Sequence, residues 1–528
     1  MSELIHHFIG IQAARRPDAP ALLYKNDSYS YSDLQGSIDT VTAGLLNLGL
    51  EPAERVAIYL PKVPKAVYGI FGTAQAGGAF VPVNPLLKPA QVSYILRDCN
   101  VRILITSSDR LSLLANVIPE CHDLRAVVVV DNKLPSVGSI PGLDLLTWDL
   151  FTARDQISRL PSRIDTHMTA ILYTSGSTGR PKGVVLSHRN MVAGAESVAK
   201  YLGNTRDDRL LAVLPMSFDY GLSQLTTAFS VGASVALMDY LLPRDVVKAI
   251  SRHNITGLAA VPPLWQQLAQ LEWPDDAINS LRYITNSGGA MPKTTTEQLR
   301  QRLPNTEIFL MYGLTEAFRS TYLPPDQVEV RPDSMGKAIP NAEILVVRED
   351  GTECAPDEPG ELVHKGALVA MGYWNDPEKT SIRFKPAPNQ PAGIPLTEIA
   401  VWSGDRVRKD EEGYLYFISR NDEMIKTSGY RVSPTEIEEV VYSSRLVKEV
   451  VALGIPHSTL GQAIILIVSD SDTPDIDGIM RHCQKELPNF MIPQVILAKD
   501  SLPRNQNGKI NRQSLAAEYG DFFQESEN

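Results

Sequence analysis

Short apolar segments alternate with longer amphipathic ones along most of the chain. From Arg55 onward, "RVAIYL", "AFVPV", "RILIT" and "LRAVVVV" are typical of buried strands, and "VPKAVYGIFGTAQAG" and "KPAQVSYILRDC" are typical of helices. The alternation resumes with "LLAVLP", "SVALM", "TGLAAV", "RYITN" and "TEIFLM". This pattern predicts parallel sheets covered by helices, and therefore an α/β fold.

After about Gly336 the pattern changes to strands separated by turns. "AEILVVREDG", "GELVHKG", "IAVWSGD" and "GYLYFIS" predict a smaller β-rich subdomain attached to the main body. The segment "KPAPNQPAGIP", from Lys385 to Pro395, holds too many prolines for a helix or a central strand. We expect it to be an exposed loop.

Beyond Arg420 the alternation of strand and helix begins afresh. "SPTEIEEVVYSS" predicts a helix that Ser433 caps, with Glu436 in the capping-box position. "VKEVVALGIP", "QAIILIVSD" and "DGIMRHCQKEL" follow it. We therefore expect an N-terminal domain with two helix-covered sheets and a β-rich subdomain, residues 1–420. A small α+β C-terminal domain would take residues 421–528.

Length and charge narrow the class of protein. The 528 residues exceed what one core usually holds, so more than one domain is expected. The net charge is −11, and Lys and Arg are scattered, which argues against a nucleic-acid partner. None of the four cysteines has zinc-type spacing, and so few predict reduced structural thiols: Cys99, Cys121, Cys354 and Cys483.

The sequence also carries no membrane or export signal that we recognise. No stretch of about twenty apolar residues could form an integral membrane segment. The first residues, "MSELIHHFIGIQAARRP", lack a basic segment followed by a cleavage site and predict an amphipathic helix. We expect a cytoplasmic protein.

One loop carries a chemical signal. "YTSGSTGRPKG", from Tyr173 to Gly183, follows an apolar strand and is built of small residues around one lysine. Small residues let backbone N–H groups approach a polyphosphate, and Lys182 adds a positive charge. The loop is not the common phosphate-binding loop of nucleotide hydrolases, because Lys182 follows Pro181 and precedes Gly183. By itself, such a loop could equally be a turn or a linker.

Further motifs accompany it in a fixed order from Ala76 to Asn511. They are "AGGAFVPVNP", "MYGLTEA", "WSGD", "GYLYFISRNDEMIKTSGYRVSPTEIE" and "LPRNQNGKINR". With them the chain resembles the adenylate-forming superfamily: acyl-CoA synthetases, amino-acid adenylation domains and firefly-type luciferases. The resemblance implies an ATP-dependent, AMP-forming ligase that turns a carboxylic acid into acyl-AMP, releases pyrophosphate and passes the acyl group to a thiol.

The resemblance also implies the residues that bind ATP. Glu316 would coordinate Mg²⁺, as suits a hard oxygen ligand. Thr315 would donate to the α-phosphate, Tyr312 would lie against adenine, and Gly313 stands in the same motif. The departing phosphates would be held by Thr174, Ser175, Gly176, Ser177, Thr178, Gly179 and Lys182.

Three more residues would complete the nucleotide site. Asp405 would accept hydrogen bonds from the ribose hydroxyls, and Arg420 would contact the nucleotide. The family more usually has Thr two residues before this Asp, so Ser403 is a mild departure. Lys509, in "NQNGK", matches the catalytic lysine that bridges the substrate carboxylate and the phosphate.

In this superfamily the small C-terminal domain rotates between two half-reactions. Asp422 matches the hinge. In the second state Ser428 and Gly429 would line a tunnel for the thiol. That thiol would belong either to CoA or to the phosphopantetheine of a carrier protein.

The substrate pocket should be formed by the residues between the glycine loop and "YGLTE". Asp219, in "SFDYG", matches the carboxylate that pairs with the substrate amino group in amino-acid adenylation domains. A buried carboxylate without a cationic partner is costly, so an amino or imino acid makes physical sense. The other candidates, placed by the same match, are Tyr220, Ser223, Leu264, Thr285, Ser287, Gly288, Met311, Arg319 and Ser320.

Alternatives remain open for the substrate and the acceptor. Tyr220 and Met311 are bulky and favour a small acid, whereas Arg319 could pair with a second carboxylate or neutralise Asp219. "SFDYGLSQL" and "YGLTEAFRSTYLPP" also resemble stand-alone bacterial acyl-CoA ligases linked to exosortase systems. We expect a small amino or imino acid loaded onto a carrier protein in trans. An acyl- or aryl-CoA synthetase and a catalytically silent interaction module are the alternatives.

Overall fold

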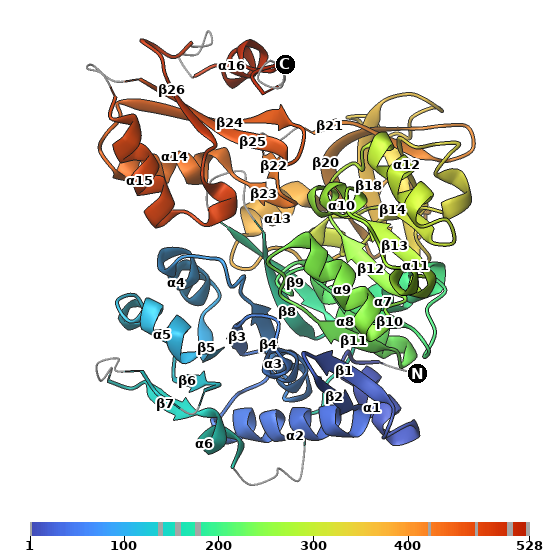
Figure 1. Ribbon diagram of the computed structural model, residues 1–528, viewed down its shortest axis with the longest axis vertical. Helices are drawn as coiled ribbons and strands as arrows, with labels where there is room; N and C mark the ends of the chain where they lie inside the picture. The colour runs from blue at the N-terminus through green and yellow to red at the C-terminus, as the bar shows by residue number, and fades with distance from the viewer. Residues whose placement is uncertain are drawn as a thin grey trace.

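The computed structural model describes most of the chain. The described residues are 3–131, 133–135, 141–153, 160–174, 181–420, 424–469, 474–503 and 510–523, with only the backbone at 419 and 420. Within them the strands form three sheets, of seven, fourteen and five strands (Figure 1). No helix in these ranges is long and apolar enough to span a bilayer.

The first sheet lies in the N-terminal part of the chain, in the strand order β7-β6-β5-β3-β4-β8-β9. Its neighbours are parallel except for the last pair, β8 and β9, which is antiparallel. The predicted strands of this sheet are confirmed: β3 (Arg55–Tyr59), β4 (Ala79–Pro82), β5 (Val101–Thr106), β6 (Ala126–Val129) and β8 (Met168–Thr174). The strands β7 (Asp144–Thr147) and β9 (Lys182–Ser187) were not predicted.

The second sheet contains the other predicted parallel strands. β11, β10, β12, β13 and β14 are parallel neighbours, and antiparallel pairing begins at β15. The chain's first strands, β1 (Pro20–Tyr24) and β2 (Asp27–Ser30), close the other edge through β11. The main strands are β10 (Arg209–Ala212), β11 (Ser234–Leu237), β12 (Gly257–Ala260), β13 (Tyr283–Asn286), β14 (Glu307–Tyr312) and β15 (Thr321–Leu323).

Helices between these two sheets form one shared core. Phe71 of α3 meets Phe229 of α8 edge to face, with the ring centroids 5.5 Å apart. The same apolar cluster includes Ile58 of the first sheet and Val235 of the second. Burial of this cluster holds the two sheets in one orientation. The helices on this side are α1 (His7–Arg15), α2 (Tyr31–Asn47), α3 (Pro64–Gln75), α7 (His188–Tyr201) and α8 (Asp219–Val231).

Most of the remaining helices cover the other faces, whereas the short helix Trp148–Thr152 packs on α2, where Phe151 joins the shared core. α4 and α5 pack on the far side of the first sheet, where Ile95 and Leu111 join Leu104 of β5 in a separate cluster. α9 to α12 accompany β10 to β14 (Figure 1). Their bounds are α4 (Pro89–Asp98), α5 (Ser108–Leu114), η1 (Ile118–Glu120), α6 (Trp148–Thr152), α9 (Pro243–His253), α10 (Pro262–Ala269), α11 (Asp275–Ser280) and α12 (Lys293–Arg302).

The predicted β-rich subdomain extends the second sheet rather than standing apart. Its antiparallel strands continue from β15 through β16 and β21. The expectation of a loop from Lys385 to Pro395 was wrong at its start, because β19 pairs with β20 at the sheet edge, where prolines are tolerated. The elements are η2 (Thr315–Ala317), η3 (Pro325–Gln327), β16 (Ser334–Ala338), β17 (Ala342–Val347), β18 (Gly360–Gly366), α13 (Pro377–Arg383), β19 (Phe384–Pro386), β20 (Ile399–Lys409) and β21 (Leu415–Arg420).

The C-terminal domain has its own sheet, in the order β23-β22-β25-β24, with β26 beside β25. Ser433 caps α14 as predicted, accepting a hydrogen bond from the backbone N–H of Glu436. The domain boundary near Asp422 stays a prediction, since residues 421–423 lie outside the described ranges. The elements are β22 (Ile425–Thr427), β23 (Tyr430–Val432), α14 (Pro434–Ser443), β24 (Glu449–His457), β25 (Gly461–Ser469), α15 (Ile476–Glu486), η4 (Asn489–Met491), β26 (Val495–Ala498) and α16 (Arg512–Glu518).

The C-terminal domain rests on the N-terminal part through a few polar and aromatic contacts. The side-chain amide of Gln91, on α4, donates to Oε1 of Glu436 over 2.9 Å. That of Gln266, on α10, donates to the carbonyl of Ser458 over 2.8 Å. Tyr430 meets Phe218 edge to face, at 4.9 Å between centroids. These contacts keep β22 and β23 beside the carboxyl ends of the second sheet's parallel strands.

Glu436 makes this interface sensitive to pH. Burial against α4 raises the pKa of its carboxyl from 4.5 to about 7, and the nearby charge of Glu439 adds to the rise. The folded state therefore binds more protons than the unfolded state between these values, so stability falls as pH rises through this window. Above about pH 7 the whole penalty is present.

We expect Glu436→Gln to stabilise the protein at pH 8 by up to about 3 kcal/mol, at about 1.4 kcal/mol per pKa unit. Near pH 4 the gain should vanish, because both states then carry a neutral carboxyl. Thermal unfolding from pH 4 to 8 measures the difference. Glu439→Gln, on the exposed side of the same helix, is the control, and an equal gain there would contradict the prediction.

Candidate active site

The candidate site lies where the carboxyl ends of parallel strands meet. β12, β13 and β14 end at Ala260, Asn286 and Tyr312, and the motif residues of the second sheet follow directly. β8 of the first sheet ends at Thr174, the first residue of the glycine loop. Ligands of open α/β sheets bind at this edge.

Lys182, Glu316 and Tyr373 form a buried polar cluster between the two sheets. The Tyr373 hydroxyl donates to Oε1 of Glu316 over 2.6 Å and accepts from the Lys182 ammonium over 2.8 Å. Lys182 Nζ also lies 3.5 Å from the same carboxylate oxygen and 4.2 Å from the centre of the Tyr373 ring. The cluster therefore joins β9, η2 and the segment before α13.

Opposite charges decide the ionisation of Glu316. Burial by itself raises the pKa of its carboxyl, but Lys182, Arg431 and the Tyr373 hydroxyl outweigh burial and lower it to about 2. Burial lowers the pKa of Lys182, and Glu316 opposes that effect. The cluster thus holds a carboxylate and an ammonium close together, ready to meet a polyphosphate and a cation.

A second pair lies at the position expected for the nucleoside. The Tyr312 hydroxyl donates to Oδ2 of Asp405. Two further hydrogen bonds orient Asp405. Its backbone N–H donates to the Ser403 hydroxyl over 3.0 Å, and that hydroxyl donates to the Leu362 carbonyl over 2.7 Å. A serine is thus sufficient for this task. The backbone of Asp405 pairs with that of Arg420 on β21.

Glu316 fits a Mg²⁺ site in which the protein supplies one carboxylate and the substrate supplies phosphate oxygens. Among the described residues no group of three or more His, Cys, Asp or Glu side chains could enclose a metal ion. A lone buried carboxylate suits Mg²⁺, which often uses one or two carboxylates together with substrate phosphates. Glu316 would hold the ion, which would neutralise phosphate charge.

Several expected residues lie outside the described ranges. They are Ser175, Gly176, Ser177, Thr178, Gly179, Asp422 and Lys509, together with the side chain of Arg420. Thr174 is half-buried at the end of β8, and Thr315 begins η2. Gly313 lies against Arg319, since a Cβ at Gly313 would come within 3.4 Å of the Arg319 Cα.

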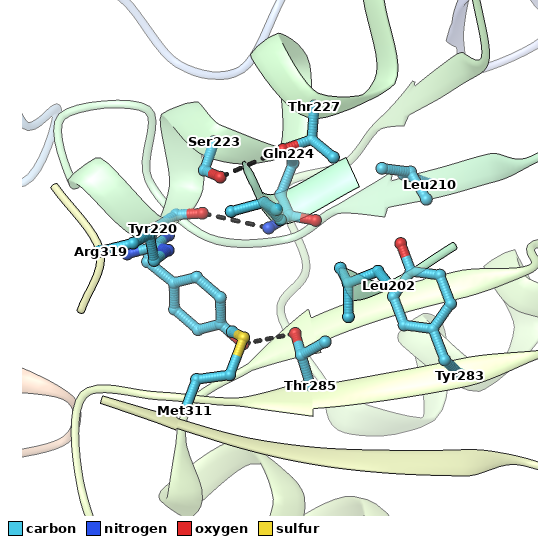
Figure 2. A pocket seen from close by; sticks show the side chains of 11 residues that line it. Leu202, Leu210, Tyr220, Ser223, Gln224, Thr227, Tyr283, Thr285, Met311 and Arg319 are labelled. Carbon is cyan, nitrogen blue, oxygen red and sulfur yellow. Dashed lines mark hydrogen bonds between the residues drawn. The ribbon is translucent and has the colours of Figure 1, made fainter. Parts of the chain in front are cut away.

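A small cavity between α7, α8 and β13 contains part of the expected substrate pocket (Figure 2). Its volume is about 10 Å³, and the Tyr220 hydroxyl bonds to Thr285 Oγ1 over 2.7 Å across it. Five expected residues line it: Tyr220, Ser223, Thr285, Met311 and Arg319. Six more were not expected: Val198, Leu202, Leu210, Gln224, Thr227 and Tyr283.

The remaining pocket candidates lie elsewhere. Leu264 and Ser287 are buried but do not line the cavity, and Gly288 is exposed. The Ser320 hydroxyl lies 3.0 Å from Nδ1 of His364. The sequence motifs alone could not predict which candidates line the cavity. Part of the lining comes from α7, and α7 reaches the cavity only because it packs on α8.

Asp219 already has a partner. Nη1 of Arg319 donates to its Oδ2 over 3.0 Å, and the Arg319 side chain is 2% exposed. Burial raises the pKa of Asp219, and Arg319 opposes the rise. Of the two roles left open for Arg319, neutralisation of Asp219 is the one found. Removing one partner of such a buried pair typically costs about 3–5 kcal/mol.

Ser428 and Gly429 form the turn between β22 and β23, both with positive φ, of 52° and 81°. This turn touches the N-terminal part: a Cβ at Gly429 would lie 2.8 Å from a Val261 methyl group, and the Gly429 carbonyl faces Gly288. The backbone of the turn therefore reaches the residues that follow the carboxyl ends of β12 and β13. α16, which follows Lys509 in sequence, lies on the opposite side of the C-terminal domain (Figure 1).

Comparison with known proteins agrees with this arrangement. Residues 10–374 match the model of the AMP-binding enzyme family, and residues 436–509 match that of the AMP-binding enzyme C-terminal domain. The chain belongs to the AMP-binding enzymes. The family that the motifs predicted is therefore confirmed.

Relatives differ in substrate and in acceptor. The chain is 31% identical over 510 residues to the L-proline–[L-prolyl-carrier protein] ligase of Streptomyces coelicolor, covering 93% of this chain and 92% of that one. It is 27% identical to the long-chain-fatty-acid–CoA ligase of Bacillus subtilis, with 96% and 93% covered. With tyrocidine synthase 3 of Brevibacillus parabrevis it shares 29% identity but spans only 8% of that protein.

A solved structure supports the fold. The o-succinylbenzoate CoA synthetase of Bacillus subtilis superposes with a TM-score of 0.83 at 24% identity, covering 96% of this chain and 97% of that one. The α/β fold class, with a large N-terminal part and a small C-terminal domain, is confirmed.

Sequence reasoning missed three side chains of this AMP-binding enzyme. Tyr373 bonds to Glu316, and Arg383 and Arg431 add positive charge near Lys182. Arg431 stands inside a quoted motif, "SGYRVSP", but its charge gave no sign of where it would point. Tyr373 is brought to β9 by a single bridge to Val184, which no local pattern reveals.

We expect Tyr373→Phe to lower acid-dependent ATP–pyrophosphate exchange about tenfold, because one lost hydrogen bond to a charged group is worth about 1.5–3 kcal/mol. The ring still packs against Phe384, at 5.5 Å between centroids, so folding should be retained. Tyr416→Phe, which loses a hydroxyl bonded to Asp410, is the control. Equal losses in both variants would count against the role of Tyr373.

Proposed function

We propose that this enzyme activates a small carboxylic acid as its acyl-adenylate and transfers the acyl group to a thiol carried by a partner protein. The observation that supports this most directly is the cluster of Lys182, Tyr373 and Glu316 at the end of the glycine-loop strand. It combines a cation for phosphate with an ionised carboxylate for Mg²⁺. Both are needed when two anions must meet.

The first half-reaction forms a bond between a carboxylate oxygen of the acid and the α-phosphorus of ATP. The bond between that phosphorus and the oxygen bridging to the β-phosphate breaks, and pyrophosphate leaves with the electron pair. Lys182 and the residues from Thr174 to Gly179 hold the departing phosphates. Asp405 and Tyr312 orient the nucleoside, and Lys509 bridges the reacting carboxylate and phosphate.

In the second half-reaction a thiolate attacks the acyl carbon. A thioester forms, the bond from the acyl carbon to the phosphate oxygen breaks, and AMP leaves. The Ser428–Gly429 turn beside Val261 supports a role for it at the thiol's entrance.

We propose a carrier protein's phosphopantetheine as the acceptor. The name of the prolyl-carrier relative, which the chain matches along 92% of its length, supports this choice. Free CoA is the alternative, and the name of the fatty-acid–CoA ligase favours it. A silent interaction module is less well supported, because Lys182, Glu316 and Asp405 are all present and brought to one edge.

The nature of the acid depends on the Asp219–Arg319 pair. Arg319 already neutralises Asp219, so a substrate ammonium group would meet a pair without net charge instead of a free carboxylate. This counts against the amino or imino acid expected from the sequence, which stays as a second candidate because of the prolyl relative. We therefore propose an acid without an ammonium group.

Acid-dependent ATP–pyrophosphate exchange tests the proposed function. The panel contains proteinogenic amino acids, β-amino acids, and hydroxy, keto, fatty and aryl acids of graded length. We expect exchange with small acids that lack an amino group, followed by transfer to a phosphopantetheinylated carrier protein. Exchange with no acid, in a protein shown by calorimetry to bind no ATP, would refute a ligase.

Asp219→Ala separates the two candidate substrates. In an enzyme that binds an ammonium group through Asp219, this change abolishes exchange with the amino acid. If Asp219 acts by holding Arg319, we expect a loss of about tenfold or more that is the same with and without an amino group on the acid. The ratio of kcat/KM values for matched acids measures this. A loss confined to amino acids would instead support an amino acid as the substrate.

Gly429→Ala tests the role of the turn between β22 and β23. Its φ of 81° and its closeness to Val261 mean that a methyl group strains the backbone and pushes the turn from the site. We expect thioester formation to fall by about tenfold or more, and exchange to fall less.

Gly461→Ala is the matched control for that change. Gly461 also has a φ of 81° and lies in the same sheet, where its nearest neighbour would be the Lys426 carbonyl at 3.4 Å. It carries the same backbone strain without a contact to Val261. A transfer defect of the same size in both variants would remove the special role of Gly429.

A further inference from the structure

Arg319 has hydrogen-bonding capacity that the protein does not use. Its Nη1 donates to Asp219 Oδ2 over 3.0 Å and to the Phe318 carbonyl over 3.1 Å. Nε and Nη2 are buried, and neither has an acceptor among the described residues. Buried N–H groups of a guanidinium are nearly always paired, so two orphan donors on one side chain require an explanation.

The backbone at this position is held in an unfavourable conformation. Phe318 has a φ of 56°, in the left-handed region that a bulky side chain rarely adopts. Its ring is fully buried and packs against Gly194 of α7, where any side chain would collide with it. The packed ring thus fixes the strained turn, and the turn directs the Arg319 side chain inward. Strain of this kind is concentrated at functional sites.

Arg319 lines the small cavity beside Tyr220 (Figure 2). Its guanidinium lies 4.8 Å from the centre of the Tyr220 ring, which fixes its plane. The cavity volume of about 10 Å³ is about what one water-sized group occupies. Met311 also lines the cavity, and its flexible side chain can make room for a few more atoms. The site therefore suits a compact group that accepts hydrogen bonds.

Charge selects among the possible acceptors. Arg319 and Asp219 together are neutral, so an uncharged oxygen adds no net charge to the buried site. A second carboxylate would leave a net negative charge there, and the field of Glu316 already acts on Asp219. An ammonium group could not accept from Nε–H or Nη2–H at all.

We propose that Arg319 is the specificity-determining residue of the acid pocket, and that it binds an uncharged oxygen, a hydroxyl or a carbonyl, on a small carboxylic acid. This rests on the proposed adenylation function and names its substrate class: short hydroxy or keto acids. The free Nε–H and Nη2–H groups donate to that oxygen, while Nη1 stays with Asp219.

The test compares acids that differ in one group. ATP–pyrophosphate exchange is measured with propanoate, lactate, pyruvate, alanine and malonate, and with butanoate, 3-hydroxybutanoate, 3-aminobutanoate and succinate. We expect at least one hydroxy or keto acid to exceed its unsubstituted parent in kcat/KM by about 100-fold or more, since a site built to donate rejects an analogue without the acceptor. Exchange confined to unsubstituted, amino or dicarboxylic acids would overturn the inference.

Variants connect that selectivity to the side chain. Arg319→Gln keeps a donor for Asp219 but loses the guanidinium fork, and it should bring the ratio of kcat/KM between the oxygenated acid and its parent close to one. The double change Arg319→Leu with Asp219→Leu removes both charges and should do the same without leaving a carboxylate buried alone. An unchanged ratio in both would overturn the proposal.

Arg102→Gln is the matched control, because Arg102 pairs with Glu54 and Asp123 far from the cavity. Its selectivity ratio should stay as in the unaltered chain. ATP binding measured by calorimetry distinguishes a failure of the proposed Arg319 role from a failure of the proposed ligase function. An enzyme that binds ATP and exchanges only with acids outside the named class keeps its ligase function and refutes the role of Arg319. An enzyme without ATP binding refutes the ligase function itself.

Discussion

The site depends on a buried carboxylate that is kept ionised. Glu316 is removed from water, which by itself would favour its neutral form, and the charges of Lys182 and Arg431 and the hydroxyl of Tyr373 reverse that preference. These groups come from β9, from β23 of the C-terminal domain and from the segment before α13. A carboxylate buried in this way is stable only when its partners are all in position. The charge of Glu316 therefore couples the two large sheets and the C-terminal domain to one point.

The second buried pair, Asp219 and Arg319, has a different proposed role. Lys182 and Glu316 lie at the proposed phosphate site, whereas Asp219, at the start of α8, and Arg319 lie at the proposed acid pocket. The first pair has a hydroxyl between its members and a third cation nearby. In the second pair, Nε and Nη2 of Arg319 have no acceptor among the described residues. In the proposed function, the first pair serves the phosphates of ATP and the second determines which acid is bound.

The C-terminal domain touches the N-terminal part lightly. Its contacts include a turn of two residues with positive φ, a pair of aromatic rings, two side-chain amides and the charge of Arg431 near Glu316. Such an interface is small compared with the continuous core between the two large sheets. The half-buried Glu436 carboxyl, with its raised pKa, makes the stability of this interface dependent on pH.

The sequence alone determined the α/β class, nearly every strand of the parallel sheets and the family. Hydrophobic periodicity is local, and motifs such as "YTSGSTGRPKG" and "MYGLTEA" keep their spacing within one turn or loop. It also indicated that Asp405, Glu316 and Lys182 belong to one site. Tertiary structure alone decided that Tyr373 bridges Lys182 and Glu316, that Leu264 and Ser287 stay out of the cavity, and that Arg319 pairs with Asp219. The reason is physical: these partners lie 57 to 191 residues apart and meet only when helices and sheets pack, and no local pattern records that packing.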